Sequence, residues 1–154
     1  KDRMKYQTIG PDKLNQLRHA RMFHTVNELY SHMKKHAAIL RPKFETVLNE
    51  LDGQLSGLGI ARWTKPRGGY FISLYVPEGC AKRTVELCAN AGMILTPAGA
   101  TYPYGIDPFD SNIRIAPSYP SVEEIEKASE VLCTAVRYAA LESLIDNYKE
   151  TATT

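Results

Sequence analysis

The stretch from Met93 to Tyr119 combines an arginine, a glycine-containing turn and several tyrosines, which are residue types that bind small anionic ligands. Arg114 stands between Ile113 and Ile115, and neighbouring side chains of a strand point to opposite faces. If the two isoleucines face the core, Arg114 faces the other side. A guanidinium held there would bind a carboxylate or a phosphate, because its planar fork matches two oxygens at once. The alternative is an arginine that lies in solvent on an edge strand.

Two short apolar runs flank the turn. Met93–Thr96 leads into Pro97-Ala98-Gly99, and Ile113–Ile115 follows an irregular loop that is rich in Tyr, Pro and Asp. We predict that both runs are strands. Asp107 and Asp110 fit a turn in the loop better than a catalytic carboxylate pair.

Two helices are predicted in the first third of the chain. Gly10-Pro11-Asp12 is a typical helix start, and a short helix follows it. Thr25 and Glu28 form a capping-box pattern, and apolar residues then recur at steps of three and four as far as Gly53. Pro42 lies inside this long helix. Because proline removes a backbone donor and clashes with the preceding turn, we predict a kink before it.

The remaining two thirds of the chain alternate between strand and helix patterns. We predict a hairpin of Ala61–Trp63 and Tyr70–Val76, a helix at Cys80–Ala91 and a long final helix that begins at Ser121. The sum is an α/β (α+β) two-layer sandwich. A small mixed or antiparallel sheet is covered by helices, with a long kinked N-terminal helix and a long C-terminal helix.

Composition limits the classes of function. The 154 residues are enough for one domain, and a net charge of +2 creates no large field for nucleic acid or anionic membrane. No apolar run is long enough to span a bilayer. Cys80, Cys88 and Cys133 are odd in number and lack C-x-x-C spacing, which indicates free thiols in a reducing compartment. We therefore expect a cytoplasmic protein with no nucleic-acid or membrane partner.

Two histidines of the predicted long helix have the spacing of a metal site. His32 and His36 are four residues apart and could bind one metal from a single helix face. The residues between them lack the glutamate that a metallopeptidase uses as a base, and Lys34 and Lys35 would repel a cation. We interpret them as surface histidines and predict no metal site.

Three motifs resemble one enzyme family in their order and spacing. GGYFISL (Gly68–Leu74), LTPAGATYPYG (Leu95–Gly105) and NIRIAPSYPS (Asn112–Ser121) are similar to the C-terminal domain of class I/II pyridoxal-phosphate-dependent aminotransferases of fold type I. The stretches Gln7–Phe23 and His32–Leu48 resemble the same family, in particular its aspartate-aminotransferase-like, MocR-related subgroup. The resemblance covers nearly the whole chain.

The resemblance implies a role in binding the substrate of a transamination, which exchanges an amino group between an amino acid and a 2-oxo acid. Arg114 matches the family's arginine that clamps the α-carboxylate of the amino acid. The resemblance also implies a supporting shell and a pocket wall around it, formed by Asn112, Gly99, Pro97, Tyr104, Tyr70 and Phe71.

The same resemblance implies that the lysine that holds pyridoxal phosphate as a Schiff base lies upstream of this chain. Lys65 is a superficial candidate, but it precedes Pro66 in a turn, so we interpret it as a turn lysine. We therefore expect no catalytic residue here. Pyridoxal phosphate would be bound by the full-length enzyme, a homodimer, and not by this chain alone.

The implied domain organisation has three parts. Residues 1–24 would be a remnant of the large domain and linker, residues 25–149 the small C-terminal aminotransferase domain, and residues 150–154 a disordered tail. We expect such a chain to be part of a longer enzyme and inactive by itself. Two alternatives stay open: a stand-alone α/β module that binds amino or oxo acids without a cofactor, and a structural domain in which Arg114 pairs with an internal carboxylate.

Overall fold

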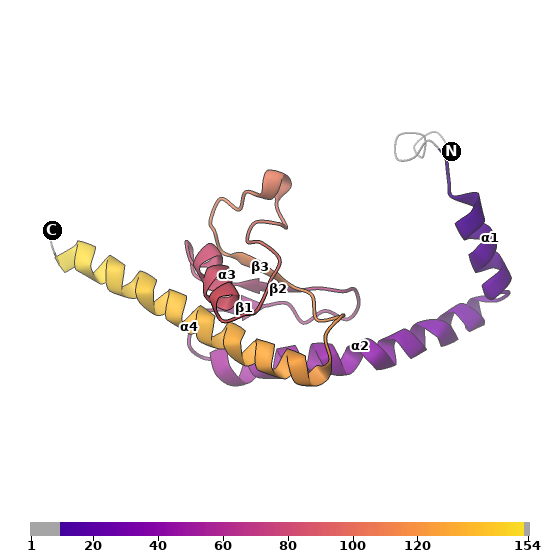
Figure 1. Ribbon diagram of the computed structural model, residues 1–154, viewed down its shortest axis with the longest axis horizontal. Coiled ribbons are helices and arrows are strands. Elements are labelled where there is room, and N and C mark those ends of the chain that lie inside the picture. The colour runs from indigo at the N-terminus through magenta and orange to yellow at the C-terminus, as the bar shows by residue number, and fades with distance from the viewer. Residues whose placement is uncertain (1–9, 153–154) are drawn as a thin grey trace. The chain divides into compact units, whose positions relative to one another are not determined.

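The computed structural model describes residues 10–152, which divide into two units between Ile39 and Leu40. Figure 1 shows the elements in chain order. They are α1 (Lys13–Met22), α2 (Val26–Leu55), β1 (Arg62–Trp63), β2 (Ile72–Tyr75), α3 (Ala81–Asn90), the short 3₁₀ helix η2 (Pro103–Gly105), β3 (Asn112–Ile115) and α4 (Val122–Ala152).

The first unit contains α1 and the start of α2, and both helices begin at the predicted caps. Asp12 accepts a hydrogen bond at Oδ1 from the backbone N–H of Asn15, at 2.9 Å. At α2, the hydroxyl of Thr25 accepts from the N–H of Glu28 at 3.2 Å, and the Glu28 carboxylate accepts from the N–H of His24 at 2.8 Å. The capping-box pattern therefore marks a true helix start.

Pro42 lies inside α2, and the helix runs through it to Leu55, two residues beyond the predicted end at Gly53. The hydroxyl of Thr46 donates to the carbonyl of Pro42 at 2.9 Å, one turn along the helix. The predicted kink before Pro42 stays a prediction.

Within residues 10–152 the sheet has three strands in the order β1-β2-β3, and both pairings are antiparallel. The predicted hairpin of β1 and β2 is confirmed, with Arg62 opposite Tyr75. The predicted strand Met93–Thr96 is wrong. Its backbone pairs with no strand of the sheet, and Ile94 is 93% exposed. This segment and β3 instead line the same cavity.

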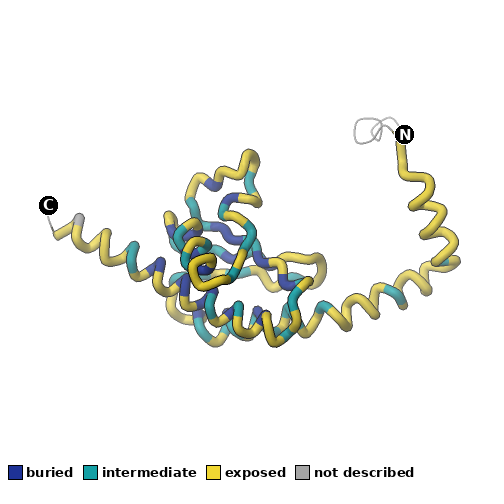
Figure 2. Tube along the Cα trace, in the orientation of Figure 1, coloured by how far each residue is buried: buried dark blue, intermediate teal, exposed yellow. Residues whose placement is uncertain are grey.

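The core lies between one face of the sheet and the helices of the second unit. Ile72, Leu74, Ile113 and Ile115 alternate along β2 and β3 and are buried against apolar residues of α2, α3 and α4. Figure 2 shows the buried positions concentrated in the strands and in the first part of α4. The two-layer α+β arrangement is therefore confirmed, and Arg114, between the two isoleucines, projects from the opposite face of the sheet.

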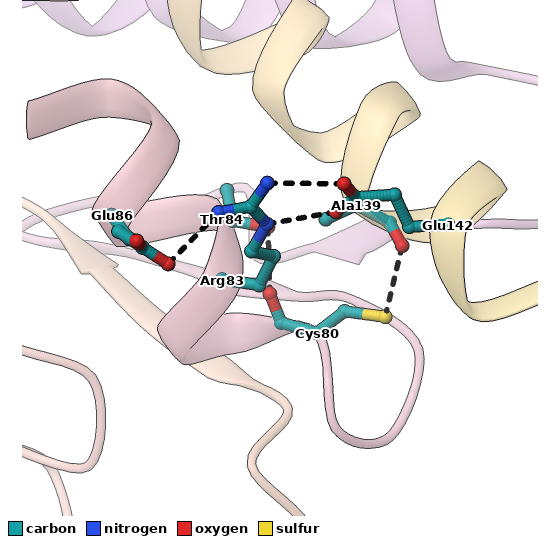
Figure 3. A network of polar contacts seen from close by, with 6 residues as sticks. All are labelled: Cys80, Arg83, Thr84, Glu86, Ala139 and Glu142. Atoms are coloured by element: carbon teal, nitrogen blue, oxygen red, sulfur yellow. Dashed lines mark hydrogen bonds and ion pairs between the residues drawn. The ribbon is translucent and has the colours of Figure 1, made fainter. Parts of the chain in front are cut away.

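A polar network joins α3 to α4 (Figure 3). The Arg83 guanidinium donates to both carboxylate oxygens of Glu142, at 2.8 and 3.0 Å, and to Glu86 at 3.0 Å. These carboxylates raise the pKa of Arg83 further above its ordinary value. The thiol of Cys80 donates to the carbonyl of Ala139 at 3.7 Å. The network fixes α3 alongside α4, which closes one side of the core.

The final helix α4 begins at a reciprocal capping box, as predicted. Ser121 accepts at Oγ from the N–H of Glu124 at 3.2 Å, and Glu124 accepts at Oε2 from the N–H of Ser121 at 2.7 Å. The helix continues to Ala152, so it enters the tail that we expected from residue 150. Among the described residues, no helix is both long enough and apolar enough to cross a membrane.

Candidate functional site

Arg114 lies in the middle of β3, directly opposite Ser73 of β2. Its guanidinium carbon Cζ is 4.6 Å from the centroid of the Phe71 ring, within the range of a cation–π contact. Its Nε is buried and has no hydrogen-bond partner. Within residues 10–152 no carboxylate forms an ion pair with this guanidinium, so its charge is available to an external anion.

A cavity of about 340 Å³ lies beside Arg114. Arg114 and Ile115 of β3 both line it, although neighbouring residues of a strand point to opposite faces of the sheet. The cavity must therefore reach both faces, which it can do at β3 because this strand is an edge of the sheet. The rest of the lining comes from the irregular segment at residues 93–96, from the residues after β3, from α4 and from Val47 of α2. Its lining is mostly apolar and includes one carboxylate, that of Glu124.

A larger hollow of about 640 Å³ lies elsewhere, between the Gly79–Cys80 turn and the second half of α4. Arg83, Glu142 and Asp146 line it, and Arg83 and Glu142 already neutralise each other across the α3–α4 contact. It includes none of the predicted site residues. We therefore place the candidate site at Arg114.

Asn112 holds the strand that carries Arg114. Its side chain is almost fully buried, and its amide donates to the hydroxyl of Ser73 at 2.8 Å. Its carbonyl oxygen accepts from the hydroxyl of Thr101 at 2.6 Å. Both hydrogen-bonding ends of this amide are thus used within the protein, which is the geometry of a supporting residue.

The carboxylate of Asp107 organises the chain just before β3. It accepts hydrogen bonds from the backbone N–H groups of Phe109 at 3.0 Å and of Ser111 and Asn112 at 2.8 Å. Burial alone would raise the pKa of Asp107, but these donors, with the N–H of Asp110, hold it below its ordinary value. The prediction that Asp107 is a turn residue is confirmed, and the turn ends directly at Asn112.

Gly99 occupies a position that no other residue fits. Its φ is +85°, and a Cβ on it would overlap the carbonyl oxygen of Gly105 and lie 3.3 Å from the backbone nitrogen of Asp107. The turn continues with a hydrogen bond from the N–H of Tyr102 to the carbonyl of Gly99 at 2.9 Å. The backbone at Gly99 thus lies close to that of Gly105 and Asp107, so the loop that connects residues 93–96 to β3 folds back on itself.

The structure brings only part of the predicted pocket wall to Arg114. Phe71 is in contact with the guanidinium, although it does not line the cavity itself. Tyr104 is 98% exposed and Tyr70 61% exposed, and neither of these nor Pro97 lines the cavity. Their roles in substrate binding stay predictions.

Residues that sequence reasoning missed come mainly from helices. Glu124 and Ser129 of α4 and Val47 of α2 line the cavity, although they lie far from Arg114 along the chain. Their sequence pattern shows only that they belong to amphipathic helices. No local signal assigns them to a site.

The histidine pair of α2 is in direct contact. Nε2 of His32 and Nε2 of His36 are 2.9 Å apart, and the ring of Phe23 lies 5.1 Å from that of His32. No third ligand joins them: among the described residues there is no cluster of three or more His, Cys, Asp or Glu side chains that could hold a metal ion.

Comparison with known proteins gives the family. The sequence model described as "Aspartate amino-transferase" matches residues 1–148. The chain is 52% identical to an aspartate aminotransferase of Corynebacterium glutamicum over 134 residues, which are 87% of this chain and 31% of that protein. It superimposes on the crystal structure of an aspartate transaminase from the same species with a TM-score of 0.83 and 48% identity, over 92% of this chain and 34% of the other.

A more distant neighbour shares the fold alone. An α-aminoadipate aminotransferase of Thermus thermophilus, complexed with N-(5′-phosphopyridoxyl)-L-leucine, matches with a TM-score of 0.62 and 19% identity, over 72% of this chain and 28% of the other. The chain thus spans about a third of the length of the two Corynebacterium glutamicum proteins. With a family match over nearly its whole length, the chain belongs to the aspartate aminotransferase family.

Proposed function

We propose that this chain is the substrate-carboxylate-binding part of a pyridoxal-phosphate-dependent aminotransferase, in which Arg114 binds the α-carboxylate of the amino acid or the 2-oxo acid. The observation that carries the proposal is the state of Arg114. Its guanidinium lies beside a cavity, has no carboxylate partner within residues 10–152, and keeps one buried nitrogen without a hydrogen bond. A guanidinium without an internal carboxylate leaves its terminal nitrogens free to form a bidentate pair, so a ligand carboxylate is the natural partner for this group.

The binding step needs only the chemistry of the guanidinium. Two parallel N–H donors hold both oxygens of a carboxylate in one plane, and the opposite charges make these bonds stronger than neutral ones. A carboxylate fixed in this way leaves the rest of a small substrate with few orientations, which prepares it for reaction.

The described lysines are not placed to hold an aldehyde cofactor covalently at the Arg114 cavity. No lysine of the described chain lines the cavity at Arg114. Lys65 forms an exposed ion pair with Asp52 at 2.7 Å, and Lys43 donates to the carbonyls of Ser118 and Tyr119. We therefore propose that the cofactor and the catalytic lysine belong to another part of a longer enzyme, and that this chain alone does not bind the cofactor stoichiometrically.

The relatives support a proposal for the substrate class. The protein with 52% identity is named an aspartate aminotransferase, so we propose that the full-length protein accepts a dicarboxylic amino acid. Arg114 would hold the α-carboxylate, and the group that binds the side-chain carboxylate would come from outside this chain. A preference for alanine over aspartate would contradict this substrate class.

The decisive experiment replaces Arg114 in the full-length enzyme. Arg114→Ala removes a charge-assisted hydrogen bond of about 3 kcal/mol, so we expect kcat/KM to fall by about two orders of magnitude, with a higher KM for both the amino acid and the oxo acid. Arg114→Lys should recover only part of this loss, since a lysine makes no bidentate pair.

Arg62 provides a matched control. It also stacks on an aromatic ring, that of Tyr75 at 3.7 Å, but it does not line the cavity. Arg62→Ala should therefore leave kcat/KM within about threefold of the parent, as expected of a surface substitution. Unchanged kinetics in Arg114→Ala would refute the proposed function.

A second experiment tests the cofactor part of the proposal on this chain directly. The polypeptide is mixed with pyridoxal phosphate, reduced with borohydride and weighed by mass spectrometry. We expect no single stoichiometric adduct, whereas one adduct on one lysine would show that the chain carries its own cofactor site.

Three further assignments are part of the same proposal. The stretches Gln7–Phe23 and His32–Leu48 support membership of the MocR-related subgroup, and the family supports a homodimer as the active form. The free, buried state of Cys80, Cys88 and Cys133 supports a reducing, cytoplasmic compartment. Sedimentation of the full-length protein tests the homodimer.

A further inference from the structure

Phe71 lies next to Arg114 across two antiparallel strands. Ser73 is the direct partner of Arg114, and Phe71 stands two residues before Ser73, so the two side chains are diagonal neighbours on one face of the sheet. The Arg114 side chain extends along this diagonal until Cζ is 4.6 Å from the ring centroid. Phe71 itself is 47% exposed, so its ring covers Arg114 on one side and meets solvent on the other.

The nitrogens of the guanidinium have different surroundings. Nε is buried without a hydrogen-bond partner, whereas the terminal nitrogens are not among the buried unpartnered atoms of the described chain. The negative face of an aromatic ring attracts a cation and accepts N–H groups weakly. Within residues 10–152, the cation–π contact with the Phe71 ring is the attractive contact that the structure gives for this guanidinium.

From this geometry we propose that Phe71 is a positioning residue for substrate binding: its ring fixes the plane of the Arg114 guanidinium and turns the terminal nitrogens toward the substrate carboxylate. The proposal rests on the function proposed above for Arg114. An arginine side chain has many rotamers, and a carboxylate that binds a mobile arginine must immobilise it. A ring that holds the guanidinium beforehand removes this cost, so Phe71 acts on affinity through Arg114 and touches no reacting atom.

The first test compares aromatic and aliphatic residues at position 71 in the full-length enzyme. Phe71→Leu keeps an apolar side chain and removes the ring face. We expect KM for the amino acid and the oxo acid to rise roughly three- to tenfold, with kcat changed less than about threefold, which is the range of one cation–π contact. Phe71→Tyr and Phe71→Trp keep the ring face and should restore KM to within about twofold of the parent.

The matched control removes the other arginine–aromatic stack on the sheet. Tyr75 holds Arg62 at 3.7 Å, a closer contact than that of Phe71 with Arg114, but Arg62, unlike Arg114, does not line the cavity. Tyr75→Leu should therefore leave KM unchanged. If it raises KM as much as Phe71→Leu does, the effect comes from general disturbance of the sheet, and the proposal is wrong.

A double-mutant cycle shows whether Phe71 acts through Arg114. In the Arg114→Ala background the ring has no guanidinium to hold, so adding Phe71→Leu should change KM by less than about 1.5-fold. A full additional loss in that background would overturn the positioning role. If Phe71→Leu does not accumulate as folded protein, Phe71→Met replaces it, with Phe71→Tyr as its aromatic counterpart.

The two proposals fail in different ways. If Arg114→Ala has parental kinetics, the proposed function itself is wrong. If Arg114→Ala is strongly impaired while Phe71→Leu and Phe71→Tyr are both equal to the parent, the carboxylate clamp stands and Phe71 does not position it.

Discussion

The side-chain amide of Asn112 donates a hydrogen bond to the hydroxyl oxygen of Ser73, the residue that lies opposite Arg114 in the sheet. Asn112 also accepts from Thr101 of the loop, and its own backbone N–H is held by Asp107. One buried side chain thus connects β2, β3 and the loop, two residues before the arginine. The position of the guanidinium depends on this connection as well as on its contact with Phe71.

Replacing Asn112 should therefore destabilise the domain. Asn112→Ala removes the hydrogen bonds with the hydroxyls of Ser73 and Thr101, and we expect the free energy of unfolding to fall by about 1–3 kcal/mol, since each such bond contributes about 0.5–1.5 kcal/mol. Urea unfolding of the protein and of the variant measures the difference. Asn49→Ala, at an exposed position of α2, is the control and should change stability by less than about 0.5 kcal/mol. Equal effects of the two substitutions would contradict the role of Asn112.

Gly99 gives a sharper test of the loop, because the chain contains a matched glycine. Gly99 and Gly57 have φ of +85° and +80°, but a Cβ at Gly57 meets no atom within 4 Å, whereas one at Gly99 overlaps the Gly105 carbonyl. Gly57→Ala should cost about 1 kcal/mol, the strain of a positive φ alone. Gly99→Ala should cost about 2–4 kcal/mol in total, since the backbone of the loop must also move. Chemical denaturation measures both, and equal losses would show that the loop accommodates a Cβ.

The sequence was sufficient for features that depend on local pattern. The alternation of Ile113, Arg114 and Ile115 predicted which face of the sheet the arginine occupies, and the capping boxes at Thr25 and Ser121 predicted where two helices begin. Local hydrogen bonds and side-chain alternation decide such features within a few residues.

The features that could not be predicted depend on pairing between distant segments. Met93–Thr96 has the composition of a strand, but a strand forms only if its backbone pairs with another strand, such as the neighbouring edge strand β3. In the structure this segment and β3 line a cavity and do not pair. The contact of Phe71 with Arg114 depends on the register of β2 against β3, since a shift by one residue would place Phe71 on the other face. The cavity lining from α4 depends on how that helix packs, which the sequence pattern does not specify.

Asp107 should control stability in acid. Its carboxylate accepts three backbone N–H groups of the turn before β3, and its pKa is lowered below the ordinary value of about 4. Because the pKa is lower in the folded protein than in the unfolded chain, the ionised carboxylate of Asp107 stabilises the fold above about pH 4. This stabilisation is lost as the pH falls through the native pKa, when the carboxylate takes up a proton.

Asp107→Asn should therefore lower the melting temperature at neutral pH, because an amide has only one oxygen that accepts. The difference from the parent should shrink below about pH 4, since the parent loses its carboxylate there. Asp52→Asn is the control, because it removes only an exposed ion pair with Lys65 and should have a small effect. A difference between Asp107→Asn and the parent that stays constant from pH 7 to pH 2.5 would contradict this account.

The three thiols should be unreactive in the folded protein. Burial raises the pKa of Cys88 to about 11, and burial together with the nearby Glu50 carboxylate raises that of Cys133 to about 12. Burial is also the main cause that raises the pKa of Cys80. Because the thiolate is the reactive form, we expect almost no reaction with Ellman's reagent at pH 8 until the protein unfolds.

A Ser56→Cys variant supplies an exposed thiol as the internal standard, since Ser56 is exposed after α2. It should react quickly while Cys80, Cys88 and Cys133 react only in urea. The raised pKa values also predict the effect of alkali: the contribution of the neutral thiols to stability is complete below about pH 8.5 and is lost as the pH rises through the native values. Unfolding midpoints from pH 8 to pH 11 measure this loss. Fast labelling of any of the three in the folded protein would mean that α3 and α4 open far more readily than their packed contact and the Arg83–Glu142 ion pair allow.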